Sequence, residues 1–399
     1  MESLFEYQEE VLESVRDSYF RPLFYHLDWD QRMFGITGLR GTGKTTMLLQ
    51  YLKFNVPDHS QALYVTADHT WFYDHSLYDL ARRFTKYGGT LLLIDEIHKY
   101  PRWSRELKNI YDGLPELKVI FTASSALDIL KGEADLSRRV LTFELTGLSF
   151  REYLEFDHQQ KLTSVSLVDL LTHPDENAQD VLNNLRHPLP LFREYLQRGY
   201  FPFSKTEEPY SFRQKLNQVI NTIMEVDLQI IEDYSAANTI KMKRLLGVIA
   251  ESAPFEPNIS KIASRLEMGR DTVKTYLNNL ENARLLNLLS RSTKGVASLQ
   301  KPDKIYVENT NFSFALKQNP NPGTLRETFF VNQLRNAGHT VELAPEGDFL
   351  VDKKWTFEVG GPSKDETQIR QAENAYLALD ELEHAYLNRI PLWLFGFLY

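Results

Sequence analysis

Residues 33–49 carry the sequence feature that most limits what this chain can fold into. The stretch reads MFGITGLRGTGKTTMLL, in which Gly38, Gly43, Lys44 and Thr45 fill the pattern G-x-x-x-x-G-K-[ST]. Glycines let consecutive backbone N–H groups turn inward around a phosphate, because a Cβ atom would block either the backbone conformation or the close approach. The pattern therefore predicts a phosphate-binding loop, and the alternative is a glycine-rich turn that binds nothing.

The flanking residues predict how this loop is built into a fold. The apolar run Met33–Thr37 predicts a strand before the loop, and Thr45–Phe54 predicts a helix after it, whose N-terminus adds unpaired amides and a positive dipole end. We expect Lys44 to reach the β- and γ-phosphates and the Thr45 hydroxyl to ligate Mg²⁺, as in P-loop nucleoside triphosphatases. The residues expected to hold the nucleotide are Gly38, Gly41, Thr42, Gly43, Lys44, Thr45 and Thr46.

Composition limits the class of protein. At 399 residues the chain is too long for one ordinary core, so we expect about two to four domains. It has no cysteine, which excludes disulfides, thiol catalysis and Cys-ligated zinc and is consistent with a reducing compartment. Residues 1–20 lack the features of a secretory signal, and the apolar stretch Pro391–Tyr399 is shorter than the roughly 20 residues of a membrane span. These observations predict a soluble cytoplasmic protein without a membrane partner.

Two adjacent carboxylates end the stretch Thr90–Glu96, TLLLIDE. The apolar run before them is typical of a strand buried on both faces. Ligands of open α/β sheets bind at the carboxyl ends of strands. We therefore expect Asp95 to hold Mg²⁺ through water and Glu96 to polarise the attacking water. The alternative is that both carboxylates cap a helix at Lys99–Asp112.

Two later segments predict further groups near the phosphates. A strand at Leu117–Thr122 is followed by Ser124, our choice for a sensor of the γ-phosphate, with Thr122 and Ser125 as close candidates and a plain turn or cap as the alternative. Before a predicted strand at Val140–Leu145, Arg138 and Arg139 are candidates for neutralising transition-state charge; the alternative is surface salt bridges.

Together these motifs resemble the AAA-type ATPases of the archaeal-ATPase-like group, which commonly carry an uncharacterised C-terminal domain. The resemblance rests on GLRGTGKTT, LLLIDEIHKYPRW, FTASSA and LSRR followed by LTGLSFREYL, and it covers about residues 30–155. It implies a five-stranded parallel sheet with the P-loop strand beside the sensor strand, and binding of ATP with Mg²⁺. The absence of an evident N-K-x-D-like segment favours ATP over GTP.

Residues 241–299 predict a winged helix. Helical runs at Met242–Ser252, Ile259–Leu266 and Asp271–Leu285, the last capped by Asp271, precede a short strand and a hairpin turn. The segment holds ten Lys and Arg against five Asp and Glu, a local charge of 10 − 5 = +5 in a chain of net charge −9. Arg270, Lys274 and Asn278 would lie on the exposed face of the third helix, with Arg291 and Lys294 near the wing. Duplex DNA and coupling between domains are the two alternatives for this module.

The last hundred residues resemble a PD-(D/E)XK nuclease core, with a helix from Arg326 to Ala337 and strands at Thr340–Ala344, Asp348–Val351 and Trp355–Val359. The resemblance implies a metal site at Glu327, Asp348 and Glu358. The usual lysine is missing, because Gly360 and Gly361 follow Glu358-Val359. A decayed nuclease used for binding is therefore our default, with migration of Lys364 into the site as the alternative.

The predicted fold class is α/β. Its parts are an N-terminal helical segment (1–30), a P-loop domain (31–155), a helical linker or lid (156–240), a winged helix (241–299) and an inactive nuclease-like domain (300–399). The predicted function is that of an Mg²⁺-dependent ATPase whose nucleotide state controls its C-terminal modules. A DNA-binding regulator or defence-type module licensed by ATP, a metal-dependent nuclease, and action on a protein partner are the alternatives.

Overall fold

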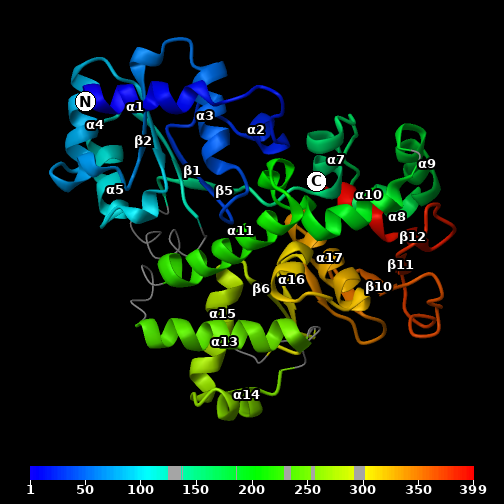
Figure 1. Ribbon diagram of the computed structural model, residues 1–399. Coiled ribbons are helices and arrows are strands. Elements are labelled where there is room, and N and C mark those ends of the chain that lie inside the picture. Colours follow the sequence, from blue (N-terminus) through cyan, green and yellow to red (C-terminus); the bar gives the residue numbers. More distant parts are fainter. Residues whose placement is uncertain (125–135, 137, 186, 229–234, 253–256, 292–301) are drawn as a thin grey trace. The chain divides into compact units, whose positions relative to one another are not determined.

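The computed structural model (Figure 1) describes residues 1–124, 136, 138–185, 187–228, 235–252, 257–291 and 302–399. These residues form two compact units, one comprising Met1–Thr146 and the other comprising Gly147–Leu228 together with Tyr234–Tyr399. Within the described ranges, no helix has both the length and the apolar composition needed to cross a membrane.

A five-stranded parallel sheet is the centre of the first unit. Its strands lie in the order β2-β3-β4-β1-β5, so that the strand before the P-loop lies between β4 and β5. The strands are β1 (Met33–Thr37), β2 (Ala62–Thr66), β3 (Leu91–Asp95), β4 (Lys118–Thr122) and β5 (Leu141–Glu144). The expected α/β fold, with the P-loop strand beside the sensor strand, is confirmed.

Helices cover both faces of this sheet, as Figure 1 shows, because its central strands are apolar on both sides. Leu92 and Ile94 of β3 pack with the helices of one face, whereas Leu91 and Leu93 pack with those of the other. The first face is covered by α4 (Leu77–Lys86) and α5 (Trp103–Gly113), and the second by α2 (Pro22–His26) and α3 (Lys44–Asn55), with α1 (Glu2–Glu13) contributing to both. This burial holds the carboxyl ends of the strands in place.

One helix of the first unit begins later than the sequence predicts. Instead of a helix from Lys99, a 3₁₀ turn spans Ile97–Lys99 and α5 begins at Trp103. Pro101 explains the break, since a proline disfavours the helical conformation of the residue before it, and Tyr100 is extended. Arg102, which follows, has a left-handed backbone with φ of 58°. The expected helix start at Lys99 was wrong.

The described residues of the second unit form many helices and two small sheets. The helices are α7 (Phe150–His158), α8 (Leu167–Thr172), α9 (Pro174–Asn184), α10 (Pro188–Glu194), α11 (Pro209–Thr222), α13 (Ala236–Ser252), α14 (Ile259–Arg265), α15 (Arg270–Asn282), α16 (Thr310–Leu316) and α17 (Pro322–Asn336). β6 (Leu286–Leu289) pairs antiparallel with β7 (Lys304–Val307). A five-stranded mixed sheet has the order β12-β11-β10-β9-β8, comprising β8 (Val341–Leu343), β9 (Phe349–Val351), β10 (Trp355–Gly360), β11 (Ala375–Leu379) and β12 (Arg389–Pro391).

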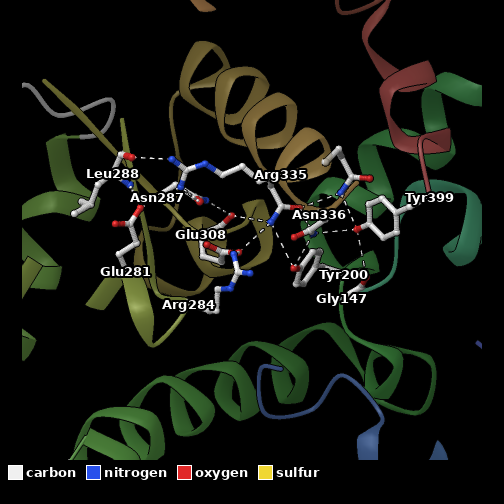
Figure 2. A network of polar contacts seen from close by, with 12 residues as sticks. Gly147, Tyr200, Glu281, Arg284, Asn287, Leu288, Glu308, Arg335, Asn336 and Tyr399 are labelled. Atoms are coloured by element: carbon white, nitrogen blue, oxygen red, sulfur yellow. Dashed lines mark hydrogen bonds and ion pairs between the residues drawn. The ribbon is translucent and has the colours of Figure 1, made fainter. Parts of the chain in front are cut away.

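A network of polar contacts around α17 joins distant segments of the second unit (Figure 2). Arg335 donates to the side chain of Asn287 on β6, over 2.9 Å. The next residue, Asn336, donates to the Tyr399 hydroxyl over 3.0 Å, and that hydroxyl donates to the carbonyl of Gly147 over 3.3 Å. The first residue of this unit is thereby connected through Tyr399 to α17 and through α17 to β6.

In the described part of residues 236–307, three helices precede two antiparallel strands, the order that a winged helix requires. The predicted wing turn, including Lys294, lies outside the described residues, so the winged helix stays a prediction. One detail was wrong: α15 begins at Arg270 and is preceded by Gly269 as N-cap, so Asp271 lies within its first turn and caps nothing. The glycine permits the extended N-cap without a side-chain partner.

Candidate functional site

The P-loop links the end of β1 to the start of α3. Gly38, Gly41 and Gly43 all have positive φ, of 137°, 83° and 99°, the region that glycine enters at no steric cost. At Gly38 the packing is also tight, because a Cβ atom there would lie 2.3 Å from the carbonyl oxygen of Leu145. The helix then begins at Lys44, as a phosphate site requires.

Two buried cations lie against the backbone of this loop. The Lys44 ammonium donates to the carbonyls of Gly38 and Leu39, 2.8 Å from each. Arg21, which is 7% exposed, donates 3.1 Å hydrogen bonds to the carbonyls of Thr42 and Thr146. Lys44 therefore occupies the interior of the loop, where it would meet a phosphate. Arg21 instead holds the loop backbone through the carbonyl of Thr42.

Asp95 ends β3 beside the first residues of α3. Its Oδ2 atom accepts hydrogen bonds from the Thr45 hydroxyl at 2.8 Å and from the Tyr64 hydroxyl at 3.1 Å. A hydroxyl and a carboxylate at this distance are hard oxygen donors of the kind Mg²⁺ takes together with phosphate oxygens, so the residues fit the ion. Burial and the charge of Asp95 raise the pKa of Tyr64, which keeps this phenol a neutral donor. Tyr64 was not predicted, since an apolar β2 gives no sign of a polar role.

Glu96, the next residue, is held by its backbone and by two cations. It has a left-handed φ of 51°, and its N–H donates to the Thr122 hydroxyl over 2.9 Å. Its carboxylate pairs with Arg40 on one oxygen, at 2.9 Å, and with Lys99 on the other. Burial opposes its ionisation, but the hydrogen bond from Lys99 and the charge of Arg40 outweigh that effect and lower the pKa of Glu96. Neither Asp95 nor Glu96 caps α5.

Thr122 and Ser124 occupy different positions at the end of β4. The Thr122 hydroxyl donates to Asp95 and accepts from the Glu96 backbone, so it connects both carboxylates. Ser124 instead pairs with the buried His98, its hydroxyl 3.0 Å from Nε2. Of the three predicted sensor candidates, Thr122 is thus the one on the carboxylates, and Ser125 lies outside the described residues. A sensor role for Ser124 stays a prediction.

The two arginines before β5 differ in environment. Arg139 forms a two-pronged ion pair with Asp112 near the end of α5, at 2.9 and 3.1 Å, which is the salt bridge left open by the sequence. Arg138 is exposed. Charge neutralisation by either arginine therefore stays a prediction.

The three predicted acidic residues of the C-terminal region differ in burial, since Glu358 is buried whereas Asp348 and Glu327 are half-buried. Glu358 on β10 is fully buried and pairs with Lys364, the lysine that the sequence placed after the motif. Asp348 accepts a 2.9 Å hydrogen bond from the N–H of Val359, and Glu327 on α17 accepts one from Tyr306. Burial and the charge of Asp348 raise the pKa of Glu358, and burial likewise raises the pKa of Glu327. No group of three or more acidic or histidine residues with the geometry to hold a metal occurs among the described residues.

Comparisons with known proteins agree with the P-loop geometry. Residues 30–154 match an AAA domain family, and residues 189–321 match a domain of unknown function (DUF8612). The chain is 27% identical over 261 residues to the uncharacterized protein MJ1637 of Methanocaldococcus jannaschii, a match that covers 62% of this chain and 54% of that protein. The match thus spans about half the length of that relative.

Solved structures that match this chain include a Walker-type ATPase and a protein with AMPPCP bound. The Walker-type ATPase of Pyrococcus abyssi has a TM-score of 0.40 and 11% identity, covering 72% of this chain and 91% of that one. AMPPCP-bound DnaA from Aquifex aeolicus has a TM-score of 0.22 and 16% identity, covering 69% and 86%. Scores this low carry no argument, so the assignment rests on the family match and on the loop. The P-loop and its two carboxylates lie within residues 30–154, the part of the chain that is similar to the AAA domain family.

Proposed function

We propose that this protein hydrolyses ATP with Mg²⁺ and that its nucleotide state controls the second unit. The observation that carries the proposal is the bond from the Thr45 hydroxyl to Asp95, with Glu96 as the next residue. A hydroxyl and two carboxylates that lie together beside the predicted phosphate loop support the proposal. A pure nucleotide-binding switch would not need the second carboxylate.

Each residue has a distinct part in the proposed reaction. The loop amides and Lys44 bind the phosphates, while Thr45 and Asp95 would hold the ion, which supplies charge neutralisation on the phosphate oxygens when bound. Glu96 orients the water and accepts its proton as the oxygen attacks the terminal phosphate. The lowered pKa of Glu96 keeps it ionised for this task at neutral pH.

Phosphate release from ATP tests the proposal. The wild type should release phosphate with Mg²⁺, Lys44→Ala should lose nucleotide binding or turnover, and Glu96→Gln should keep binding while turnover falls about 10²–10⁴-fold. Turnover at the wild-type rate in Glu96→Gln would remove the assignment of Glu96. Absence of nucleotide binding by the wild type would overturn the whole proposal.

DNA binding through α15 is a second candidate function, favoured by the exposure of its basic face. Arg270, Lys274 and Asn278 of α15 are exposed, and Lys274 pairs with Asp271 at 3.6 Å. Lys261 and Arg265 of α14 are exposed as well. Cations on one such face bind phosphates with an affinity that falls steeply with salt. Duplex DNA should therefore bind at low salt and be lost in the double variant Arg270→Glu/Lys274→Glu, whereas Arg82→Glu, an exposed cation of α4, should have no effect.

The response of ATP turnover to DNA would connect the two candidates. Turnover raised by duplex DNA would make the second unit a nucleic-acid sensor, and turnover indifferent to DNA would favour a protein partner. No gel shift at low salt would exclude the DNA candidate.

A further inference from the structure

Arg40 and Lys99 engage both carboxylate oxygens of Glu96. Arg40, within the P-loop, lies 2.9 Å from Oε1, and Lys99, on the turn after β3, pairs with Oε2. The three side chains are only 20%, 22% and 23% exposed for Arg40, Lys99 and Glu96, respectively. A carboxylate with cations on both oxygens is poorly placed to accept a proton from water, so in this arrangement Glu96 is restrained.

The two cations are anchored differently. Lys99 also pairs with Asp68, which follows β2, so it is shared between two carboxylates. Burial opposes the charge of Lys99, yet its hydrogen bonds with Asp68 and Glu96 raise its pKa, which keeps it protonated. Arg40 belongs to the loop that surrounds the phosphates. A terminal phosphate attacked by a water beside Glu96 would therefore lie near the Arg40 guanidinium.

We propose that Arg40 exchanges Glu96 for the terminal phosphate of the bound nucleotide, which releases one oxygen of Glu96 to orient water. Lys99 stays on the other oxygen as a positioning residue. This inference rests on the proposed nucleotide site and adds a regulation to it. A guanidinium binds phosphate and carboxylate with the same planar fork, so the exchange replaces one charge-assisted pair with another. ADP lacks the terminal phosphate and leaves the Arg40–Glu96 pair intact.

Nucleotide affinity tests the exchange without requiring hydrolysis. With Glu96 intact, a non-hydrolysable ATP analogue should bind more tightly than ADP, and Arg40→Gln should reduce that preference about tenfold, the effect expected from losing one charge-assisted hydrogen bond. Arg82→Gln on α4 is the matched control and should leave the preference unchanged. If both nucleotides bind and Arg40→Gln leaves the ATP preference intact, the exchange is wrong. If no nucleotide binds at all, the proposed function itself has failed.

The split between turnover and nucleotide affinity tests Lys99. Because Lys99 pairs with Glu96 and Asp68, Lys99→Met should lower kcat while the affinities for ATP and ADP stay unchanged. Lys99→Arg keeps the cation and should recover most of the rate. An equal loss of nucleotide affinity and kcat, or no recovery in Lys99→Arg, would contradict the positioning role. Asp68→Asn, which keeps Lys99 but loosens its anchor, should lower kcat by less.

Discussion

The hydroxyl of Thr122 donates a hydrogen bond to the carboxylate of Asp95. The same oxygen accepts the N–H of Glu96 over 2.9 Å, and Thr122 is fully buried. One side chain therefore fixes the direction of Asp95 and the left-handed backbone of Glu96. A valine of the same shape would keep the packing and lose both bonds.

Thr122→Val should therefore slow ATP turnover more than Ser124→Ala does. Stranding a buried donor and acceptor costs about 1–3 kcal/mol, which corresponds to a loss of roughly 5- to 150-fold if it is expressed in the transition state. Thr122→Ser, which restores the hydroxyl, should recover most of the rate. Steady-state phosphate release measures all three, and a greater loss in Ser124→Ala would return the sensor role to Ser124.

Tyr64→Phe should weaken the response to Mg²⁺ while leaving nucleotide affinity without the ion unchanged. The phenol donates to the same oxygen of Asp95 that the Thr45 hydroxyl contacts, so its loss removes one of the hydrogen bonds that orient this carboxylate. We expect the Mg²⁺ concentration at half-maximal turnover to rise about 3- to 10-fold. An unchanged Mg²⁺ requirement would show that Asp95 is held adequately by Thr45 and Thr122.

Glu327 and Glu358 predict how the second unit responds to pH. Both have a pKa above the ordinary value of 4.5, so the folded protein holds protons that the unfolded chain releases. Their contribution to stability is present below about pH 4.5 and is lost as pH rises through the folded pKa. The unfolding temperature of the double variant Glu327→Gln/Glu358→Gln should thus rise relative to that of the wild type as pH increases from about 5 to about 8. A constant difference over that range would contradict these shifts.

The pairing of Lys364 with Glu358 predicts little metal-dependent cleavage of DNA. A cation on this buried carboxylate competes with a divalent ion for the same oxygen. Lys364→Ala should raise the affinity for Mn²⁺, measured by calorimetry, with Lys353→Ala as an exposed control. Cleavage by the wild type that Asp348→Ala abolishes would establish the nuclease alternative instead.

Much of the first unit could be predicted from sequence because its signals are local. The P-loop glycines indicate a backbone with positive φ angles, and four consecutive apolar residues in β3 indicate a strand buried on both faces. Thr45 and Asp95 are expected to meet for the same reason, since the topology brings strand ends to one edge. The start of α5 was missed because Pro101 acts on the residue before it, an effect weaker than the helical pattern that follows.

Long-range pairs in the site could not be predicted in the same way. Nothing in the sequence shows that Arg40 and Lys99 share Glu96, because the partners come from separate loops and the pairing depends on the left-handed turn at Glu96. Tyr64 looks like any aromatic residue of a buried strand. In the C-terminal sheet, the sequence predicted three acids and an alternative lysine, but only the fold places Lys364 on Glu358.

Arg21 joins the phosphate loop to Thr146, since it donates to the carbonyls of both Thr42 and Thr146. Gly147, the next residue, begins the second unit. If a bound phosphate draws the loop backbone inward, Thr42 carries the guanidinium with it and the chain is pulled where it leaves the sheet. Arg21 would then transmit a movement of the phosphate loop to the point where the chain leaves the sheet.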